Sequence, residues 1–174
     1  MAGFTTDLIN TPLGEMIIVT DTEGAVRALE WTDLSERMLR LLSRQYKGEH
    51  LDLKAGSAPK CVRDSLNSYF AGTLNALDAL LTNAQGSAFQ KQVWSALRDI
   101  PVGSTCSYRD IAVTVENPKG VRAVGLANGA NPICIVVPCH RVIGANGSMT
   151  GYGGGLHRKE WLLRHESALS SKLI

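Results

Sequence analysis

The sequence predicts an α+β protein of two modules, and three observations support this prediction. Two short β-type apolar runs, 16–19 and 25–31, come first, with turn-forming residues between them. Helical patterns with helix-start signals follow, and they become dense beyond residue 86. A stretch containing several Gly and Asn, 71–86, separates the two groups of elements. We therefore expect one domain over 1–84 and a second over 85–174.

The first half should form a small sheet with two helices. The turn between its strands is expected at 21–24. Asp33 and Glu36 have the spacing of a capping box, and apolar residues at helical spacing predict a helix over 34–46. A second inward-facing apolar pattern predicts a helix over 59–70.

The second half carries three helix-start signals: Ser87 with Gln90, Ser107 with Asp110, and Asn117 followed by Pro118. They predict helices over 88–99, 107–115 and 118–129. The last two are joined by only a few residues, which is typical of a helix-turn-helix. Beyond them we expect a strand over 133–137, a hairpin turning at Asn146-Gly147, a glycine cluster, and a last helix over 156–166.

Composition limits the setting but not the partner. The 174 residues contain four irregularly spaced cysteines, which suits a reduced compartment better than a disulfide framework. No apolar run approaches the length of a membrane span, so we expect a soluble cytoplasmic protein without a membrane partner. A net charge of +2 is too small to indicate nucleic acid by itself.

Cys139 is the first candidate for chemistry because His140 and Arg141 follow it directly. Neighbouring basic groups favour the thiolate, the reactive form of cysteine, so we expect an accessible, ionisable sulfur. The imidazole would take the thiol proton, and a carboxylate would hold its tautomer. Glu166 is the best candidate for that carboxylate, with Glu160 and Glu116 as rivals.

Plainer interpretations compete with this one. A cysteine after an apolar run is often only packing. Zinc is another alternative, since five residues of the types that bind zinc fall in one region: Cys134, Cys139, His140, His157 and His165. Their spacing does not form the close pairs of structural zinc sites, so we predict no metal and no cofactor.

The helix predicted over 118–129 contains Gly and Ala around one arginine, Arg122. Small residues either permit close helix packing or let the helix approach a nucleic-acid backbone. In the second case the phosphate contacts would come from Lys119, Arg141, Arg158 and Lys159.

Three groups of residues together carry a resemblance to a known family. They are Ile-Val-Val-Pro-Cys-His-Arg-Val-Ile-Gly at 135–144, Arg-Ala-Val-Gly at 122–125 with Asn131-Pro132, and Thr-Gly-Tyr-Gly-Gly-Gly at 150–155 followed by 158–166. The sequence resembles O6-alkylguanine-DNA alkyltransferases, closely over 87–166 and loosely before that. The resemblance implies a ribonuclease H-like N-terminal domain and a C-terminal winged helix-turn-helix domain that carries the chemistry.

The resemblance also implies residue roles. Cys139 would accept the alkyl group, His140 would take its proton through a water, and Glu166 would orient the ring. Asn131 would tie the turn before the active segment to it, and Tyr108 would protonate the departing base. The DNA-binding set is Arg122, the arginine finger, with Lys119, Ala123, Gly125, Ala127 and Asn128; the substrate pocket is Val142, Tyr152, Gly153 and Gly154.

The implied reaction is direct-reversal DNA repair. A monomer would bind double-stranded DNA through the minor groove, flip out an O6-alkylguanine or O4-alkylthymine, and move its alkyl group irreversibly to the cysteine. Gly153 stands where some members carry a hydroxyl, which suggests room for groups larger than methyl. Two rivals stay open: a cysteine hydrolase that turns over, and a DNA-binding or damage-sensing module in which Cys139 only packs.

Overall fold

The computed structural model describes residues 2–169, which divide into two compact units. The first unit runs to Gln85 and also includes Pro132–Val136; the second holds Gly86–Asn131 and the chain from Val137 onward. Most of the apolar run that precedes Cys139 thus belongs to the first unit, and the chain returns to the second unit at Val137. Within the described range no helix is both long and apolar enough to cross a membrane.

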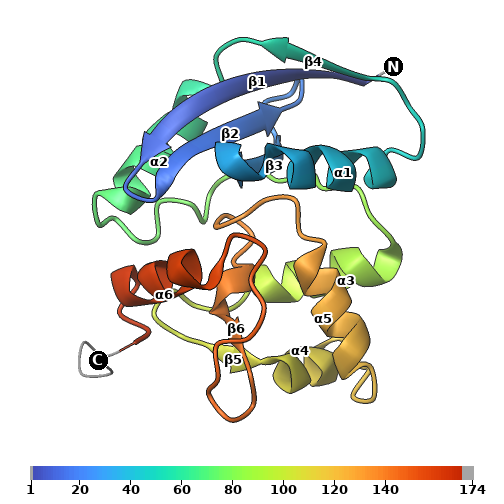
Figure 1. Cartoon of the computed structure of the whole chain (residues 1–174), viewed down its shortest axis with the longest axis vertical. Helices are drawn as coiled ribbons and strands as arrows, with labels where there is room; N and C mark the ends of the chain where they lie inside the picture. The colour runs from blue at the N-terminus through green and yellow to red at the C-terminus, as the bar shows by residue number, and fades with distance from the viewer. Residues whose placement is uncertain (1, 170–174) are drawn as a thin grey trace. The chain divides into compact units, whose positions relative to one another are not determined.

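A four-stranded sheet forms the first unit (Figure 1). The strands are β1 (Ala2–Thr11), β2 (Gly14–Thr20), β3 (Val26–Trp31) and β4 (Leu51–Ala55), in the order β3-β2-β1-β4. β2 is antiparallel to both neighbours, whereas β4 is parallel to β1. The two predicted strands and the turn between them are confirmed. β1 and β4 were missed because polar residues dilute the apolar pattern of both.

Two helices accompany the sheet: α1 (Ser35–Gln45) and α2 (Lys60–Phe70), both as predicted within one residue at each end. The capping box at Asp33 is wrong. Asp33 lies inside a 3-10 turn, η1 (Thr32–Leu34), and α1 begins directly after this turn, at Ser35, without a side-chain cap. The extended conformation ends at Trp31, which is two residues earlier than the capping pattern implied.

Helix α1 covers one face of the sheet (Figure 1). The buried cluster between them comprises Phe4, Val19, Ala28, Met38, Leu42 and Tyr46. Met16 and Ile18, which alternate with Val19 along β2, are also fully buried. Both faces of this strand are therefore covered, as in a core strand.

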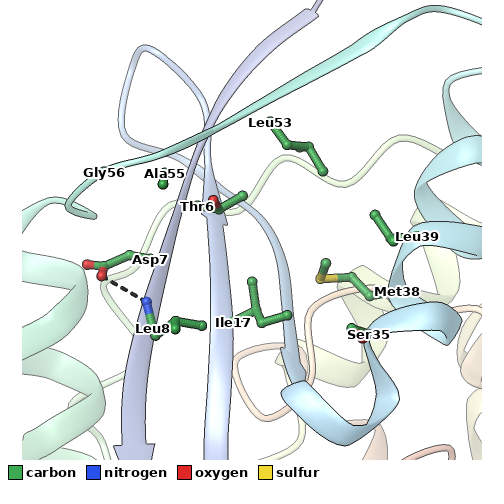
Figure 2. A pocket seen from close by; sticks show the side chains of 10 residues that line it. All are labelled: Thr6, Asp7, Leu8, Ile17, Ser35, Met38, Leu39, Leu53, Ala55 and Gly56. Atoms are coloured by element: carbon green, nitrogen blue, oxygen red, sulfur yellow. Dashed lines mark hydrogen bonds between the residues drawn. The ribbon is translucent and has the colours of Figure 1, made fainter.

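A pocket of about 500 Å³ opens beside α1 in the first unit (Figure 2). Apolar side chains supply most of its lining, among them Leu8, Ile17, Met38, Leu39 and Leu53. Its one carboxylate, that of Asp7, already accepts hydrogen bonds from the backbone of Leu8 and Ala58 and from Arg63. The pocket therefore presents a mainly apolar surface. The residues that are candidates for chemistry lie in the second unit.

In the second unit, as far as residue 169, the structure contains four α-helices and one short parallel strand pair (Figure 1). The helices are α3 (Ala88–Arg98), α4 (Tyr108–Thr114), α5 (Val121–Gly129) and α6 (Leu156–His165), and the strands are β5 (Cys106–Ser107) and β6 (Val142–Ile143). The capping boxes at Ser87 and Ser107 are confirmed. They satisfy backbone N–H groups that a helix start otherwise leaves unpaired.

The predicted start of the third of these helices is wrong. Asn117 and Gly120 instead close a turn, in which the Gly120 N–H donates to the Asn117 carbonyl at 2.8 Å, and α5 starts at Val121. The prediction of a hairpin is also wrong, because no pair of strands flanks the turn. The turn at Asn146-Gly147 exists, with the Gly144 N–H bonded to the Ser148 carbonyl at 2.8 Å, but β6 pairs with β5 instead.

Candidate active site

The apolar run before Cys139 is buried, yet it is not the predicted strand. Ile133 makes a single bridge to Leu29, and the chain then turns. The Val136 N–H donates to the Cys134 carbonyl at 2.8 Å around Ile135, which has φ of +69°. A β-branched residue in that region is strained, by roughly 1–3 kcal/mol. Apolar, β-branched composition therefore predicted burial correctly and conformation incorrectly.

A second tight turn delivers Cys139. The Cys139 N–H donates to the Val137 carbonyl at 2.8 Å, around Pro138 with φ of −82° and ψ of 63°, the geometry of an inverse γ-turn. The side-chain amide of Asn131 donates to the same carbonyl at 2.8 Å. Asn131 is fully buried, so this bond fixes the turn without competition from water.

Cys139 opens a 3-10 turn, η2 (Cys139–Arg141), and its residue exposure is only 5%. The sulfur is thus less accessible than expected from the sequence. A reacting group must enter a largely desolvated site, where electrostatic interactions are stronger than in water.

Glu166 gathers His140 and Arg141 into one buried network. The Nε2 atom of His140 lies 2.9 Å from Glu166 Oε1. Arg141 donates from Nε to Glu166 Oε2 at 2.9 Å and from Nη2 to Oε1 at 3.0 Å, and from Nη1 to the Ile100 carbonyl at 2.7 Å. This is the bidentate geometry that makes arginine–carboxylate pairs strong. The rival Glu160 instead pairs with Arg164, and Glu116 is exposed.

The network sets the charge and tautomer of His140. Burial lowers the pKa of His140, against the opposing pull of Glu166, so the ring is neutral at physiological pH. Burial also acts to raise the pKa of Glu166, but hydrogen bonds from His140 and Arg141 outweigh it and hold that pKa well below its usual range. A neutral ring facing an ionised carboxylate carries its proton on Nε2. Nδ1 is then a bare acceptor, and it is buried without a hydrogen-bond partner.

Tyr108 and Lys159 meet at the carbonyl of Thr150. The Tyr108 hydroxyl donates to it at 3.3 Å, and so does the Lys159 ammonium, which also donates to the Val142 carbonyl at 2.6 Å. Burial raises the pKa of Tyr108 and lowers that of Lys159, and both groups interact electrostatically with Cys139. Tyr108 therefore stays protonated, as a proton donor must.

The other cysteines are poorer candidates for an acceptor. Burial and the charge of Asp110 raise the pKa of Cys106 to about 11, so it is a thiol at neutral pH. Cys134 is buried, and its sulfur lies 3.6 Å from Glu30 Oε1. Cys61 is exposed on α2. Within residues 2–169 no three His, Cys, Asp or Glu side chains come together as a metal site would require.

The predicted DNA-binding residues divide between two sides of α5. Arg122, Ala123 and the preceding Lys119 are exposed, and Gly125 is partly so. Ala127 and Asn128 are buried, and the Ala127 carbonyl accepts the indole N–H of Trp94 at 2.9 Å. Their inclusion in the DNA-binding set is therefore corrected: both side chains are buried, and the Ala127 carbonyl ties α5 to α3.

The predicted phosphate contacts of three of the four basic residues are also corrected. Arg141, Arg158 and Lys159 are buried, each bonded to carbonyls or a carboxylate of the second unit. The sequence contained the signal, since Arg158, Lys159, Leu162, Leu163 and Glu166 share one face at helical spacing. Charged residues on an otherwise apolar face indicate a buried polar network.

The residues predicted to line the substrate pocket differ in exposure. Val142 and Gly154 are buried, Tyr152 is half-buried, and Gly153 is exposed. The Val142 carbonyl is occupied by Lys159, and the Gly154 carbonyl accepts from Arg158 at 3.3 Å. The glycine cluster is thus attached to α6 through these buried basic side chains.

Comparison with known proteins places these residues in a family. Residues 88–168 match the family model of the 6-O-methylguanine DNA methyltransferase DNA-binding domain. The methylated-DNA–protein-cysteine methyltransferase of Shigella flexneri is 50% identical over 161 residues, 92% of this chain and 94% of that protein. The protein of the same name from Methanosarcina acetivorans is 40% identical over 163 residues, covering 92% and 97%.

Solved structures agree. The OGT protein of Mycobacterium tuberculosis in complex with DNA is 38% identical, with a TM-score of 0.75 and coverage of 95% of this chain and 93% of that one. The O6-methylguanine-DNA methyltransferase of Pyrococcus kodakaraensis is 26% identical, with a TM-score of 0.72 and coverage of 94% and 98%. On identity and coverage of this extent, the chain belongs to the methylated-DNA–protein-cysteine methyltransferase family.

Proposed function

We propose that this protein repairs O6-alkylguanine in DNA by moving the alkyl group to Cys139. The sulfur attacks the alkyl carbon, an S–C bond forms, and the bond from that carbon to the guanine oxygen breaks. The product is a thioether. Because a thioether has no carbonyl that water could attack, each molecule acts once. The rival cysteine hydrolase would pass through an acyl intermediate and would turn over.

The observation that carries the proposal is the unpartnered Nδ1 of His140 beside a carboxylate-bound Nε2. A neutral imidazole with one free, buried acceptor is a base poised to take one proton. We propose that it takes the Cys139 proton through a water molecule. Glu166 then stabilises the imidazolium, as the carboxylate of a catalytic triad does.

Tyr108 is proposed to supply the proton that the departing base needs. Its raised pKa keeps the hydroxyl protonated, and donation to a guanine ring nitrogen lets the base leave neutral. The proton lost by the thiol balances the one gained by guanine. Asn131 is proposed as a positioning residue, which holds the Val137 carbonyl and through it the turn that presents Cys139.

The DNA is proposed to lie along the exposed side of α5. Arg122 would enter the base stack where the target nucleotide rotates out, and Lys119 would contact phosphate. Minor-groove binding suits a helix that must accept any sequence, because the hydrogen-bonding pattern in that groove differs little from one base pair to another.

We propose that the protein acts as a monomer. We also propose that β1–β4 with their helices form a ribonuclease H-like domain and that α4 and α5 belong to a winged helix-turn-helix domain.

A mass measurement tests the proposed function. Duplex DNA containing one O6-methylguanine is incubated with the protein, and the peptide that contains Cys139 is weighed. We expect this peptide to gain one methyl group and the Cys61, Cys106 and Cys134 peptides to gain none. A Cys139→Ser variant is the control and should remain unmodified. Methyl on another cysteine, or on none, would reject the proposal.

The same measurement with O6-benzylguanine in the DNA tests whether Gly153 leaves room for a group larger than methyl. Transfer of methyl without transfer of benzyl would reject the proposed larger pocket.

A further inference from the structure

Helix α5 exposes a large apolar side chain on the side that carries Arg122. Leu126 is 71% exposed, whereas Val124, Ala127 and Asn128 of the same helix are buried. Leu126 follows Arg122 by four residues, so the two side chains stand one turn apart on one face, about 6 Å along the axis. The exposed face is therefore not made of small residues alone, as the sequence suggested.

Packing within the second unit does not explain this leucine. The buried side of α5 is fastened to α3, where Trp94 donates to the Ala127 carbonyl, and Leu126 points away from that side. Alanine would serve the helix at least as well, since its helix propensity is higher. A single exposed leucine is ordinary on a protein surface. What distinguishes Leu126 is its place within the segment that matches a DNA-binding domain.

The surrounding charge favours DNA as the occupant of this face. Arg122 on this face and Lys119, which precedes the helix, are exposed, and α5, from Val121 to Gly129, contains no acidic residue. A polyanion is attracted to such a face, whereas the usual protein surface mixes both signs. The groove walls of DNA are deoxyribose rings, which present apolar C–H groups to a side chain that has no hydrogen-bond donor.

Resting on the proposed function, we propose that Leu126 packs against the deoxyribose wall of the minor groove beside Arg122 and adds affinity that is independent of sequence. Consecutive base pairs are about 3.4 Å apart, so the leucine would lie within about two base pairs of the finger. Its contact is apolar and releases no counterion. Lys119, in contrast, would contribute through charge.

Salt dependence separates these two kinds of contact. Binding of an undamaged duplex is measured at several salt concentrations for the whole protein and for Leu126→Ala, Leu126→Met and Lys119→Ala. Leu126→Ala should weaken binding about tenfold at every salt concentration, and the slope of log K against log salt should stay unchanged. Leu126→Met, of similar volume, should bind within about twofold of wild type. Lys119→Ala should lower the slope by about one.

A matched control removes general effects of exposed leucine. Leu81 is also 71% exposed but lies in the first unit, so Leu81→Ala should bind as wild type does. Wild-type binding by Leu126→Ala would overturn the proposal. So would a changed oligomeric state of this variant in sedimentation, since that would indicate contact between copies.

Reaction with the free base O6-benzylguanine keeps the two proposals distinguishable. Leu126→Ala should react as fast as wild type, because the free base needs no groove contact. If wild type itself gains no alkyl group from DNA or base, the proposed function fails. If it does and Leu126→Ala binds normally, only the groove contact fails.

Discussion

Each unit buries one glutamate, and the two differ in what holds them. Glu30 in the first unit and Glu166 in the second are both 1% exposed. Three N–H donors, one from His140 and two from Arg141, reach Glu166. Glu30 accepts from Arg37, from the Trp31 N–H at 3.1 Å, and from the weakly donating sulfur of Cys134.

The difference in donors reverses the effect of burial. Burial raises the pKa of Glu30, and the bonds from Arg37, Trp31 and Cys134 offset only part of that rise. In Glu166 the bonds from His140 and Arg141 more than offset burial and keep the pKa low. A carboxylate fixed in its charged form can orient a histidine and stabilise its cation. Burial alone therefore does not decide the charge of a buried carboxyl group, whereas the strength and charge of the groups that donate to it do.

The largest difference should appear in alkyl transfer. Glu166→Gln removes the charge that holds the tautomer of His140, so transfer from O6-methylguanine DNA should slow by about 10²-fold or more. Glu30→Gln should transfer within about threefold of wild type, since Glu30 bonds to Arg37, Trp31 and Cys134 and takes no part in the proposed transfer. Both rates are measured as single-turnover time courses with excess protein. Equal slowing in the two variants would remove the distinction.

Loss of each arginine should destabilise the units unequally. Arg141→Met removes both guanidinium bonds from the buried Glu166 carboxylate, which should cost about 3–5 kcal/mol in the free energy of unfolding. Arg37 is 16% exposed, and a stranded Glu30 could take up a proton, so Arg37→Met should cost only about 1–2 kcal/mol. Urea unfolding at pH 7 measures both. A larger cost for Arg37→Met would contradict the comparison.

The pH dependence of stability should have opposite signs for the two glutamates. The folded-state pKa of Glu30 is raised, so its contribution is fully present below the unfolded value of about 4.3 and is lost as pH rises through the folded pKa. The folded-state pKa of Glu166 is lowered, so its contribution is present above about 4.3 and is lost as pH falls through the folded pKa.

Urea unfolding between pH 4 and pH 8 reads these signs, for wild type and the two Gln variants. As pH falls, the free energy of unfolding of Glu30→Gln should decrease relative to that of wild type. At the acid end, the free energy of unfolding of Glu166→Gln should increase relative to that of wild type. Parallel curves for all three proteins would show that neither carboxyl is perturbed in the stated direction.

The smallest effect should come from Cys134→Ala. This change removes one weak donor from Glu30 and a buried sulfur, at a cost of about 1 kcal/mol in stability. Alkyl transfer should stay within about twofold of wild type, because we propose Cys139 and not Cys134 as the acceptor. A loss of transfer as complete as in Cys139→Ser would instead make Cys134 part of the chemistry.

Local signals predicted most helices and part of the sheet. Ser87 and Ser107 show why: their capping boxes are formed by residues three apart, so the sequence alone contains both partners. Asp33 and Asn117 show the limit, because similar residues formed part of a 3-10 turn and of a tight turn. A cap needs a backbone geometry that one tetrapeptide does not determine.

The candidate site was predictable in its residues and not in its conformation. The Cys139-His140 motif and the family resemblance pointed to His140 and Glu166, which the structure brings to 2.9 Å. The turns around Ile135 and Pro138 depend on bonds to Asn131 and Leu29, which lie outside the apolar run. Such partners are distant or non-periodic in sequence, so no local pattern records them.

Counting transfers per molecule tests the central claim most directly, that the sulfur of Cys139 takes one alkyl group and keeps it. The protein is mixed with a tenfold excess of duplex DNA containing O6-methylguanine, and repaired DNA is followed to completion. Repair should stop at one lesion per protein molecule, with the methyl group retained at Cys139. Continued repair beyond that point, or methyl released into solution, would contradict it.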